Sequence, residues 1–283
     1  MLTFAKRTMR LYFRDKASVF FSLLAVFIII GIYILFLGDA WSQGMEFENA
    51  DVIMDAWIMS GLLAVVSFTT TMGAFGIMVD DRYKKISKDF YSSPIKRSHL
   101  AAGYIIGAFM IGLIMSLLTF VLVQLYMISN GAAVPDFYSL AKLLGLIVLS
   151  TATNTAILFF IVSFLKSQNA FGTASSIIGT FIGFLTGIYM PIGVLPDAVQ
   201  TVVKVFPVSH TATLFRQIMM EPFLNEAFNG APDEIKADFY KEMGITLSWS
   251  GNTIPWYVSI IIIVATSFLF FGLSVLSISR KSK

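Results

Sequence analysis

The sequence predicts an all-α integral membrane protein with six transmembrane helices, an N-terminal interfacial amphipathic helix and re-entrant helices between spans 5 and 6. Hydrophobic residues make up 57% of its 283 residues, and charged residues only 13%. The apolar residues gather in runs of about twenty or more, the length that a helix needs to cross the hydrocarbon core. A soluble protein does not tolerate such runs at its surface, so residues 1–283 are expected to form a single transmembrane domain.

The first eighteen residues are expected to form a helix that lies in the membrane interface. Wound as a helix, they place apolar side chains on one side and basic ones on the other. The apolar side carries Leu2, Ala5, Met9, Tyr12 and Phe13. The basic side, which should face anionic head groups, carries Lys6, Arg7, Arg10 and Arg14. The alternative is a plain basic segment in front of the first span.

Six segments are long and apolar enough to be transmembrane helices. They cover residues 19–38, 56–79, 100–129, 140–165, 171–190 and 254–279. The first follows basic residues, as the apolar run of a secretory signal peptide does. Its apolar run is longer than that of a typical signal peptide, however, and no clear cleavage pattern follows. We therefore expect it to remain in the protein.

The distribution of basic residues predicts that both termini are cytoplasmic. With the N-terminus inside, fifteen of the 20 Lys and Arg residues lie on the cytoplasmic side, six of them in the 80–99 loop. Thirteen of the 17 Asp and Glu residues then lie outside. Basic residues concentrate in the cytoplasmic loops of membrane proteins. The formal net charge of +3 therefore reports membrane orientation, and no nucleic-acid partner is expected.

The 80–99 loop is predicted to contain a short amphipathic helix, DRYKKISKDFY. Tyr83, Ile86 and Phe90 fall on one apolar stripe, the lysines between them point away, and Pro94 prevents easy continuation. Such a stripe either lies on the inner leaflet or enters a groove on a partner protein. Composition favours neither alternative.

The connection between spans 5 and 6, residues 191–253, is expected to be external. Its first part is too apolar for a solvated loop, and Pro191, Pro196 and Pro207 interrupt it too often for one span. Short re-entrant or interfacial helices fit best, because backbone at membrane depth must be covered by protein or line a cavity. The acidic second part is typical of a small solvated external subdomain.

Polar side chains inside the spans are candidates for a substrate pathway. Span 2 carries Thr69, Thr70 and Thr71, and span 4 carries Thr151 and Asn154. A threonine hydroxyl can bond to a carbonyl of its own helix, whereas the Asn154 amide should reach a neighbouring helix or a water-filled path. For Asn154, structural contact between helices is the alternative to a pathway.

Small residues in spans 3 and 5 indicate close helix contacts. Gly103 and Gly107 form a G-x-x-x-G pattern, and Gly179, Gly183 and Gly187 continue a four-residue spacing along one face of span 5. We expect packing within one subunit; the alternatives are a subunit interface or a wall that slides during transport.

The re-entrant region also carries two basic side chains of interest. His210 is expected to bond locally, with substrate contact near the outer mouth as the alternative. Arg216 should extend to the surface, pair with Glu221 or contact a lipid phosphate. Cys is absent and the chain has only two His, far apart, so thiolate and disulfide chemistry are excluded and no metal site is predicted.

The chain shows no catalytic motif and no energy source of its own. It contains no G-x-x-x-x-G-K-[ST] phosphate loop, no H-E-x-x-H and no G-x-S-x-G. The spans are also poor in the carboxylates that a proton- or sodium-coupled carrier usually needs. We therefore predict no catalytic residue, and active transport would draw its energy from another protein.

The chain resembles the membrane permeases of type-2 ATP-binding-cassette (ABC) exporters. These carry, after their second span, a coupling segment of the form E-R-x-x-G-x-x-E-x-L-x-x-x-P. Asp81, Arg82, Phe90 and Pro94 match this pattern, with Lys85 at the glycine position. The segments FAKRTMRLYFRDKASVFFSLL and GVLPDAVQTVVKVFPVSHTATLFRQIM are similar to the family's N-terminal elbow helix and to its proline-containing segment between spans 5 and 6.

The resemblance implies a permease dimer, of two copies or with a sister permease, bound to two ATPase subunits that drive export. The cytoplasmic coupling helix between spans 2 and 3 would contact the ATPase through Asp81, Arg82, Tyr83, Ile86, Phe90, Tyr91 and Pro94. Phe90→Asp should then abolish docking without affecting membrane insertion. ATP and Mg would bind to the partner, and this chain would hold no cofactor. The expected location is the bacterial plasma membrane, in contact with its lipids.

The weakly charged spans favour an amphipathic, drug-, peptide- or lipid-like substrate. A non-transporting polytopic protein, such as an assembly factor or a sensor, is the main alternative, and its 80–99 loop would bind another partner. The missing carboxylates disfavour an ion-coupled carrier.

Overall fold

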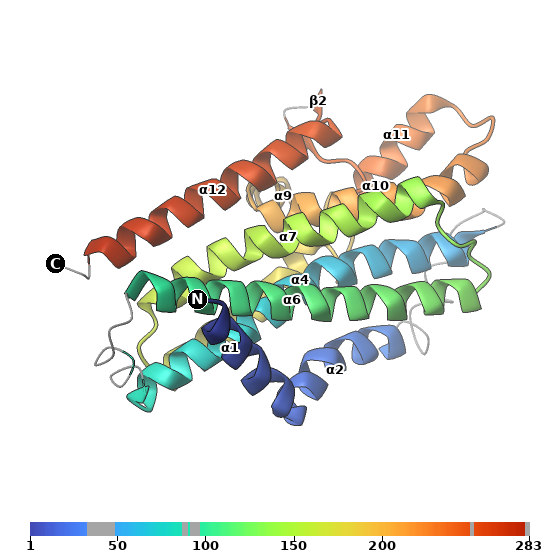
Figure 1. Ribbon diagram of the computed structural model, residues 1–283. Coiled ribbons are helices and arrows are strands. Elements are labelled where there is room, and N and C mark those ends of the chain that lie inside the picture. Colours follow the sequence, from blue (N-terminus) through green and yellow to red (C-terminus); the bar gives the residue numbers. More distant parts are fainter. Residues whose placement is uncertain (33–48, 87–89, 91–96, 250–251, 281–283) are drawn as a thin grey trace.

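The computed structural model describes residues 1–32, 49–86, 90, 97–249 and 252–280. In this part of the chain, long helices form a bundle, with a short hairpin near one end (Figure 1). In chain order the elements are α1 (Leu2–Arg14), α2 (Lys16–Ile32), α4 (Ala50–Tyr83), α6 (Arg97–Ser129), α7 (Phe137–Phe164), α8 (Gln168–Thr186), the 3-10 helix η2 (Ile192–Val194), α9 (Asp197–Val205), α10 (Pro207–Ala227), α11 (Asp233–Glu242), the antiparallel strands β1 (Ser248–Trp249) and β2 (Asn252–Thr253), and α12 (Trp256–Arg280).

Four helices of the described residues are long and apolar enough to cross a membrane, which agrees with an all-α membrane protein. They are Ala50–Tyr83, Ser98–Ser129, Phe137–Phe164 and Trp256–Leu276, at the places of predicted spans 2, 3, 4 and 6. Predicted span 1, at 19–38, lies partly outside the described residues. The helix at the place of predicted span 5, α8, is not among the four.

Helix α4 forms the centre of the bundle. It packs against α6, α7, α8 and α10, and bulky side chains such as Trp57, Leu62 and Phe75 are almost wholly buried on it. Helix α12 lies at the edge against α7 and α10, and it exposes large apolar side chains such as Phe268 and Leu269. Such an apolar face is compatible with a lipid environment, because lipid tails are as apolar as these side chains.

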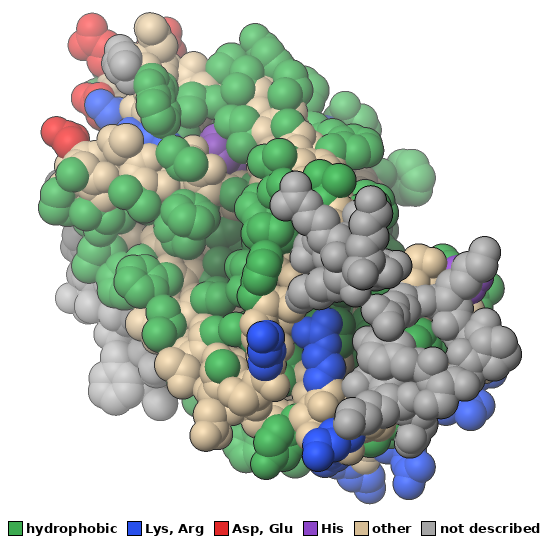
Figure 2. Space-filling model, turned by 90° about the vertical axis from the view of Figure 1, so that its left-hand side faces the viewer, with side chains coloured by type: hydrophobic (Ala, Val, Ile, Leu, Met, Phe, Trp, Pro, Cys, Tyr) green, Lys and Arg blue, Asp and Glu red, His purple; other side chains and the backbone are tan. Residues whose placement is uncertain are grey.

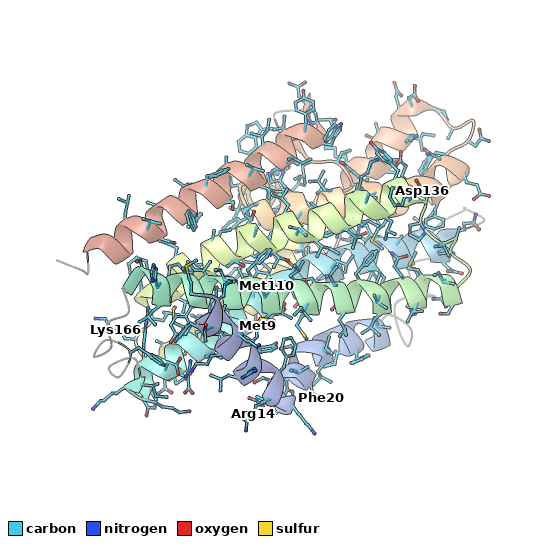
Figure 3. All side chains as sticks on the ribbon, in the orientation of Figure 1. Met9, Arg14, Phe20, Met110, Asp136 and Lys166 are labelled. Atoms are coloured by element: carbon cyan, nitrogen blue, oxygen red, sulfur yellow. The ribbon has the colours of Figure 1, made fainter. Side chains whose placement is uncertain are left out.

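The two ends of the bundle differ in charge. At one end lie α1, the last turns of α4 and α7 and the start of α6; the other carries the start of α7, α11 and the hairpin (Figure 1). Lys166 and Asp136 mark these two ends in Figure 3. Lys and Arg side chains gather on the lower part of the first end (Figure 2), which we call the basic end. We call the opposite end, with α11 and the hairpin, the acidic end.

The segment after α8 differs from the expected span 171–190. The helix ends at Thr186, because Gly187 adopts a left-handed conformation (φ 69°) and the chain turns back there. The amides of Gly187 and Ile188 donate to the carbonyls of Phe184 and Gly183, the arrangement of a Schellman helix end. The helix at the place of predicted span 5 therefore ends four residues earlier than predicted.

The three prolines predicted to interrupt residues 191–207 each stand at the start of a helix. Pro191 precedes η2, Pro196 precedes α9, and Pro207 is the first residue of α10, where a missing amide hydrogen is tolerated. Helix α10 has 21 residues and is longer than the short helices expected here; it packs against α4, α7, α8 and α12. The re-entrant or interfacial placement of this region stays a prediction.

Candidate functional site

A buried ion pair joins α1 to the last turn of α4 at the basic end. Arg7 donates two hydrogen bonds to the Asp81 carboxylate, at 2.7 and 2.9 Å, and the Tyr104 hydroxyl donates a third at 2.6 Å. Asp81 is 3% exposed. The hydrogen bonds that Arg7 donates to the Asp81 carboxylate raise the pKa of the Arg7 guanidinium above its usual value, so Arg7 stays charged. We call Arg7, Asp81 and Tyr104 the clamp.

Aromatic rings extend the clamp to the coupling segment. The ring of Phe4 packs edge-on against Phe90 and Tyr104, with centroids 5.1 and 4.8 Å away. The Arg7 guanidinium lies 5.2 Å from the centroid of the Phe90 ring, within the range of a cation–π contact. Phe90 therefore packs on α1 of its own chain, and its contact with an ATPase stays a prediction.

Two glycines let α1 approach α6. A Cβ on Gly103 would lie 2.7 Å from Cδ1 of Phe4, and one on Gly107 would lie 2.8 Å from Cβ of Thr8. Both distances are shorter than side chains allow. The G-x-x-x-G pattern thus packs α1 within the subunit, and Arg7 faces the protein, not the head groups expected for the basic side. Arg14, in contrast, points away from the bundle (Figure 3).

The neighbouring residues tie α4 to the turn between α7 and α8. Arg82 donates to the carbonyls of Val162 and Leu165 at the end of α7, at 3.3 and 3.4 Å. Gln168 donates to the Asp80 carboxylate at 2.8 Å. Carbonyls at a helix C-terminus lack partners within the helix and favour a cation. Arg82 therefore also serves internal packing, and the end of α4 connects α1, α6, α7 and α8.

The coupling segment is not the single continuous helix that its pattern predicts. Helix α4 runs to Tyr83, and Lys85, two residues later, has a left-handed backbone with φ 61°. The family pattern has glycine at this position, the residue that adopts positive φ without strain. Tyr83 is 62% exposed and Ile86 half-buried. Tyr91 and Pro94 lie outside the described residues.

Asn154 bonds to a neighbouring helix. Its amide nitrogen donates to the Ser67 hydroxyl of α4 at 2.7 Å, and Ser67 lies 3.4 Å from the hydroxyl of Ser150. All three side chains are buried. In the described structure this polar contact joins α4 to α7, so the geometry favours structural contact over a pathway for Asn154.

The candidate threonines bond to their own helices. The hydroxyls of Thr69, Thr70, Thr71 and Thr151 donate to carbonyls three or four residues earlier, at 2.7–3.4 Å. Beside these threonines, α6 approaches α4 closely, a contact that the sequence pattern did not predict. A Cβ added to Gly112 of α6 would clash with the Thr71 hydroxyl, so this glycine brings α6 against α4.

The three glycines of α8 do not form one packing face. A Cβ on Gly179 would have no atom within 4 Å, one on Gly183 would clash with the Tyr189 ring, and Gly187 lies beyond the helix end. Tyr189 folds back over α8 because of the turn at Gly187. Although the glycines are evenly spaced in the sequence, each of the three therefore has a different environment.

Arg216 is the most unusual side chain of α10. It is 0% exposed, and none of its guanidinium nitrogens has a hydrogen-bond partner in the described part of the chain. The guanidinium lies 4.6 Å from the centroid of Trp57 and packs beside Gly61 and Gly187. The expected surface position and the expected pair with Glu221 are both wrong, because α10 turns Arg216 toward α4 in the bundle centre.

His210 forms the expected local hydrogen bond and one long-range contact. Its Nε2 lies 2.9 Å from the carbonyl of Lys204, and its Nδ1 lies 3.0 Å from the hydroxyl of Ser259 on α12. His210 is 0% exposed. The ring therefore joins the start of α10 to α12 and does not face an open mouth.

A second buried carboxylate, Asp55, was missed because it precedes the apolar run. It lies in the second turn of α4 and accepts hydrogen bonds from Tyr126 at 3.1 Å and from Asn130 at 2.9 Å. Two residues later, the Trp57 indole donates to the carbonyl of Met243 at 2.7 Å. These contacts fix α4 at the acidic end, where the sequence predicts an external loop.

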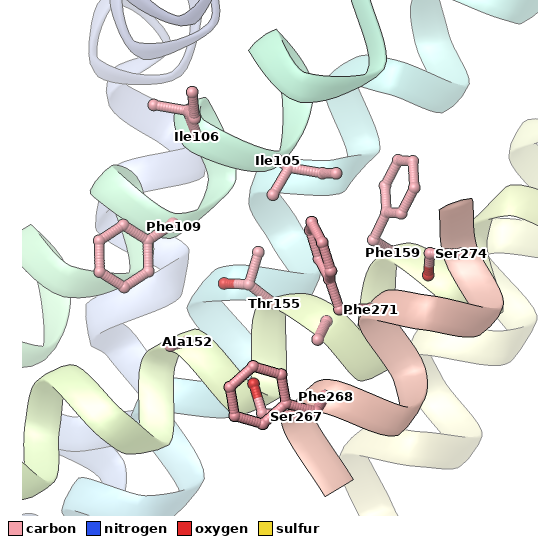
Figure 4. A pocket seen from close by; sticks show the side chains of 11 residues that line it. Ile105, Ile106, Phe109, Ala152, Thr155, Phe159, Ser267, Phe268, Phe271 and Ser274 are labelled. Atoms are coloured by element: carbon pink, nitrogen blue, oxygen red, sulfur yellow. The ribbon is translucent and has the colours of Figure 1, made fainter. Parts of the chain in front are cut away.

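An apolar cavity of about 260 Å³ lies between α6, α7 and α12 (Figure 4). Phe109, Phe159, Phe268 and Phe271 line it, together with the small polar side chains of Thr155 and Ser274. Its lining contains no charged side chain and is mostly aromatic and aliphatic, which suits an apolar group.

Comparison with known protein families agrees with this architecture. A sequence model described as ABC-2 type transporter matches residues 1–220. The chain belongs to the ABC-2 type transporter family. This ABC-2 permease is the multi-pass membrane component of an ABC transporter and is not itself the ATPase; permeases of this family work with an ABC ATPase. No curated protein matches the chain.

Proposed function

We propose that this permease belongs to an ATP-driven exporter and moves an amphipathic, drug-, peptide- or lipid-like substrate out across a bacterial plasma membrane. A separate ATPase would dock at the basic end, on the surface around Tyr83. The observation that carries the proposal is the clamp, because it joins the coupling segment to α1 and α6 at the end of the central helix.

The clamp offers a mechanical path from the docking surface to the bundle. A push on Tyr83 acts on the end of α4, to which α1 is joined through Arg7 and the α7–α8 turn through Arg82. The charge-assisted hydrogen bonds between Arg7 and Asp81 are short, at 2.7 and 2.9 Å, so α1 and the end of α4 should move together. ATP and Mg would bind to the partner, and the permease itself would supply no catalytic group.

The exposed face of α8 favours pairing of two permeases. Gly172, Thr173, Ser176 and Thr180 are exposed on this face, beside the exposed apolar side chains of Ile177 and Phe181. In a bilayer, small and hydroxyl-bearing residues concentrate where helices meet each other. A second permease against α8 would cover them, with the substrate path between the two copies.

The experiment that tests the proposal is copurification of the tagged permease from its native membrane, with ATP hydrolysis as readout. Stoichiometric ATPase is expected with the wild type. Tyr83→Ala should weaken its binding about thirtyfold, because an anchor tyrosine at an interface contributes about 2 kcal/mol. Tyr257→Ala, an exposed tyrosine at the acidic end, is the matched control.

Two outcomes would contradict the proposal. If no ATPase copurifies with the wild type, a non-transporting assembly factor or sensor becomes the better explanation. If Tyr83→Ala and Tyr257→Ala retain the ATPase equally, docking occurs elsewhere on the basic end.

A further inference from the structure

A large cavity opens at the acidic end, between α7, α10, α11 and α12. Its volume is about 830 Å³, at the upper end of the range for small-molecule sites. Leu146, Leu149, Leu214 and Ile260 form an apolar floor. Lipid-like or other apolar groups would be held here by exclusion from water.

The rim of this cavity is polar and carries more positive than negative charge. Lys142 of α7 and Lys236 of α11 line it, opposed by the single carboxylate of Glu221. The ammonium groups lie 4.0 Å from the Tyr138 ring centroid and 5.6 Å from that of Tyr240. Both lysines therefore border the cavity, where they can contact an anionic group.

Aromatic side chains place the rim at the depth of lipid head groups. Tyr138 and Trp256 line the cavity at the first turns of the apolar helices α7 and α12. Tyr and Trp concentrate at the boundary between hydrocarbon and water, where their rings bridge the two environments. A molecule in this cavity would therefore lie partly in the membrane and partly in the head-group layer.

A second apolar cavity lies farther along α7, toward the middle of the bundle. Gly145 and Leu149 line the large cavity, and Ala152 and Ala156 line the cavity of Figure 4. Their spacing of three and four residues places all of them on one face of α7. An acyl chain that enters at the rim can follow this face.

We propose that this cavity binds a membrane phospholipid, with its phosphate at Lys142 and Lys236 and an acyl chain along α7. A diffusible phosphate would leave the apolar floor unused, and an uncharged apolar molecule would leave the two lysines unused. The site is distinct from the proposed ATPase docking surface, and its occupancy does not depend on that proposal.

Fluorescence of Trp256 reports binding directly. The purified permease in dodecyl maltoside is titrated with phosphatidylglycerol that carries brominated acyl chains, which quench nearby tryptophan. We expect saturable quenching that is lost in Trp256→Phe. The double variant K142Q/K236Q should raise the apparent Kd about tenfold or more, because charge-assisted hydrogen bonds to phosphate are lost. Lys241→Gln, on the same helix as Lys236 but outside the cavity, is the control.

A cavity-filling variant tests the acyl-chain site without removing charge. A Cβ on Gly145 would have no atom within 4 Å, so Gly145→Leu fits and favours the helix. Gly145→Leu should raise the apparent Kd for the brominated lipid at least fivefold. Gly272→Leu, another helical glycine with open space around it and outside the cavity, should bind like the wild type.

Three results would overturn the proposal. Quenching that survives in Trp256→Phe would place the lipid elsewhere. Equal affinity of wild type and K142Q/K236Q, or equal affinity for brominated diacylglycerol, would exclude recognition of a phosphate. Competition by glycerol phosphate at the same concentration as the lipid would identify a site for free phosphate.

Discussion

Asp81→Asn should release α1 from the bundle. The substitution keeps the shape of the side chain but removes the charge that accepts two hydrogen bonds from Arg7 and one from Tyr104. Breaking a fully buried ion pair costs about 3–5 kcal/mol. The Arg7 side chain is 30% exposed and can be partly hydrated, so we expect a smaller loss, about 2–3 kcal/mol.

The absence of cysteine provides a clean assay for this release. Thr8, on the buried face of α1, is 1% exposed. Thr8→Cys would introduce the sole thiol of the chain, and its reaction with N-ethylmaleimide would report how often α1 opens. A loss of about 2–3 kcal/mol should speed labelling by a factor of about 30 to 140, since each 1.4 kcal/mol is a factor of ten.

A neighbouring carboxylate supplies the control. Asp80→Asn makes the same chemical change one residue earlier, but Asp80 pairs with the exposed Lys84 and with Gln168, not with α1. The labelling rate of Thr8→Cys should change by no more than a few-fold when Asp80→Asn is added. If Asp81→Asn labels no faster than Asp80→Asn, the clamp does not hold α1 and the proposed mechanical path fails. The double variant R7Q/D81N should label no faster than the faster of the two single variants, because both substitutions break the same ion pair.

Four further predictions concern helix packing and backbone strain. Lys85→Gly should raise the free energy of unfolding by about 1 kcal/mol, because glycine adopts φ 61° without strain; a lower melting temperature in detergent would contradict this. Gly112→Ala should lower the free energy of unfolding by about 1–3 kcal/mol through the clash with Thr71. Adding Thr71→Ala to the same chain should restore part of this loss, and the control Gly145→Ala should not destabilise the protein. Asn154→Leu should lower the free energy of unfolding by about 1 kcal/mol, because the hydrogen bond to Ser67 is lost. In a protein that already carries Ser67→Ala, the same substitution should have little further effect. Arg216→Met should raise the melting temperature, because the desolvation of an unpaired guanidinium costs several kcal/mol, more than the roughly 2 kcal/mol of the contact with Trp57; a lower melting temperature would contradict this.

Local patterns in the sequence predicted the helical membrane fold well. Uninterrupted apolar runs predicted the four long helices, since the length and polarity of a segment determine whether it can cross a bilayer. The positions of Pro191, Pro196 and Pro207 predicted breaks, and each stands at the start of a helix. Such features depend on residues close together in the chain.

The sequence-based predictions were wrong where a side chain has several possible partners. The basic face of α1 predicted contact with head groups, but Arg7 lies 2.7 Å from Asp81, 74 residues later. Arg216 was expected at the surface, and α10 turns it against Trp57. Helical periodicity places residues on one face, yet it does not say which helix that face meets.

The sequence by itself determined the class of protein, the main apolar helices and the resemblance to permeases that the family match confirms. Only the tertiary structure decided that Phe90 packs on α1, that Gly103 and Gly107 admit α1, and that two lysines far apart in sequence border one cavity. The physical reason is that burial and length are local properties of a segment, whereas ion pairs, close backbone approaches and cavities depend on how distant helices pack.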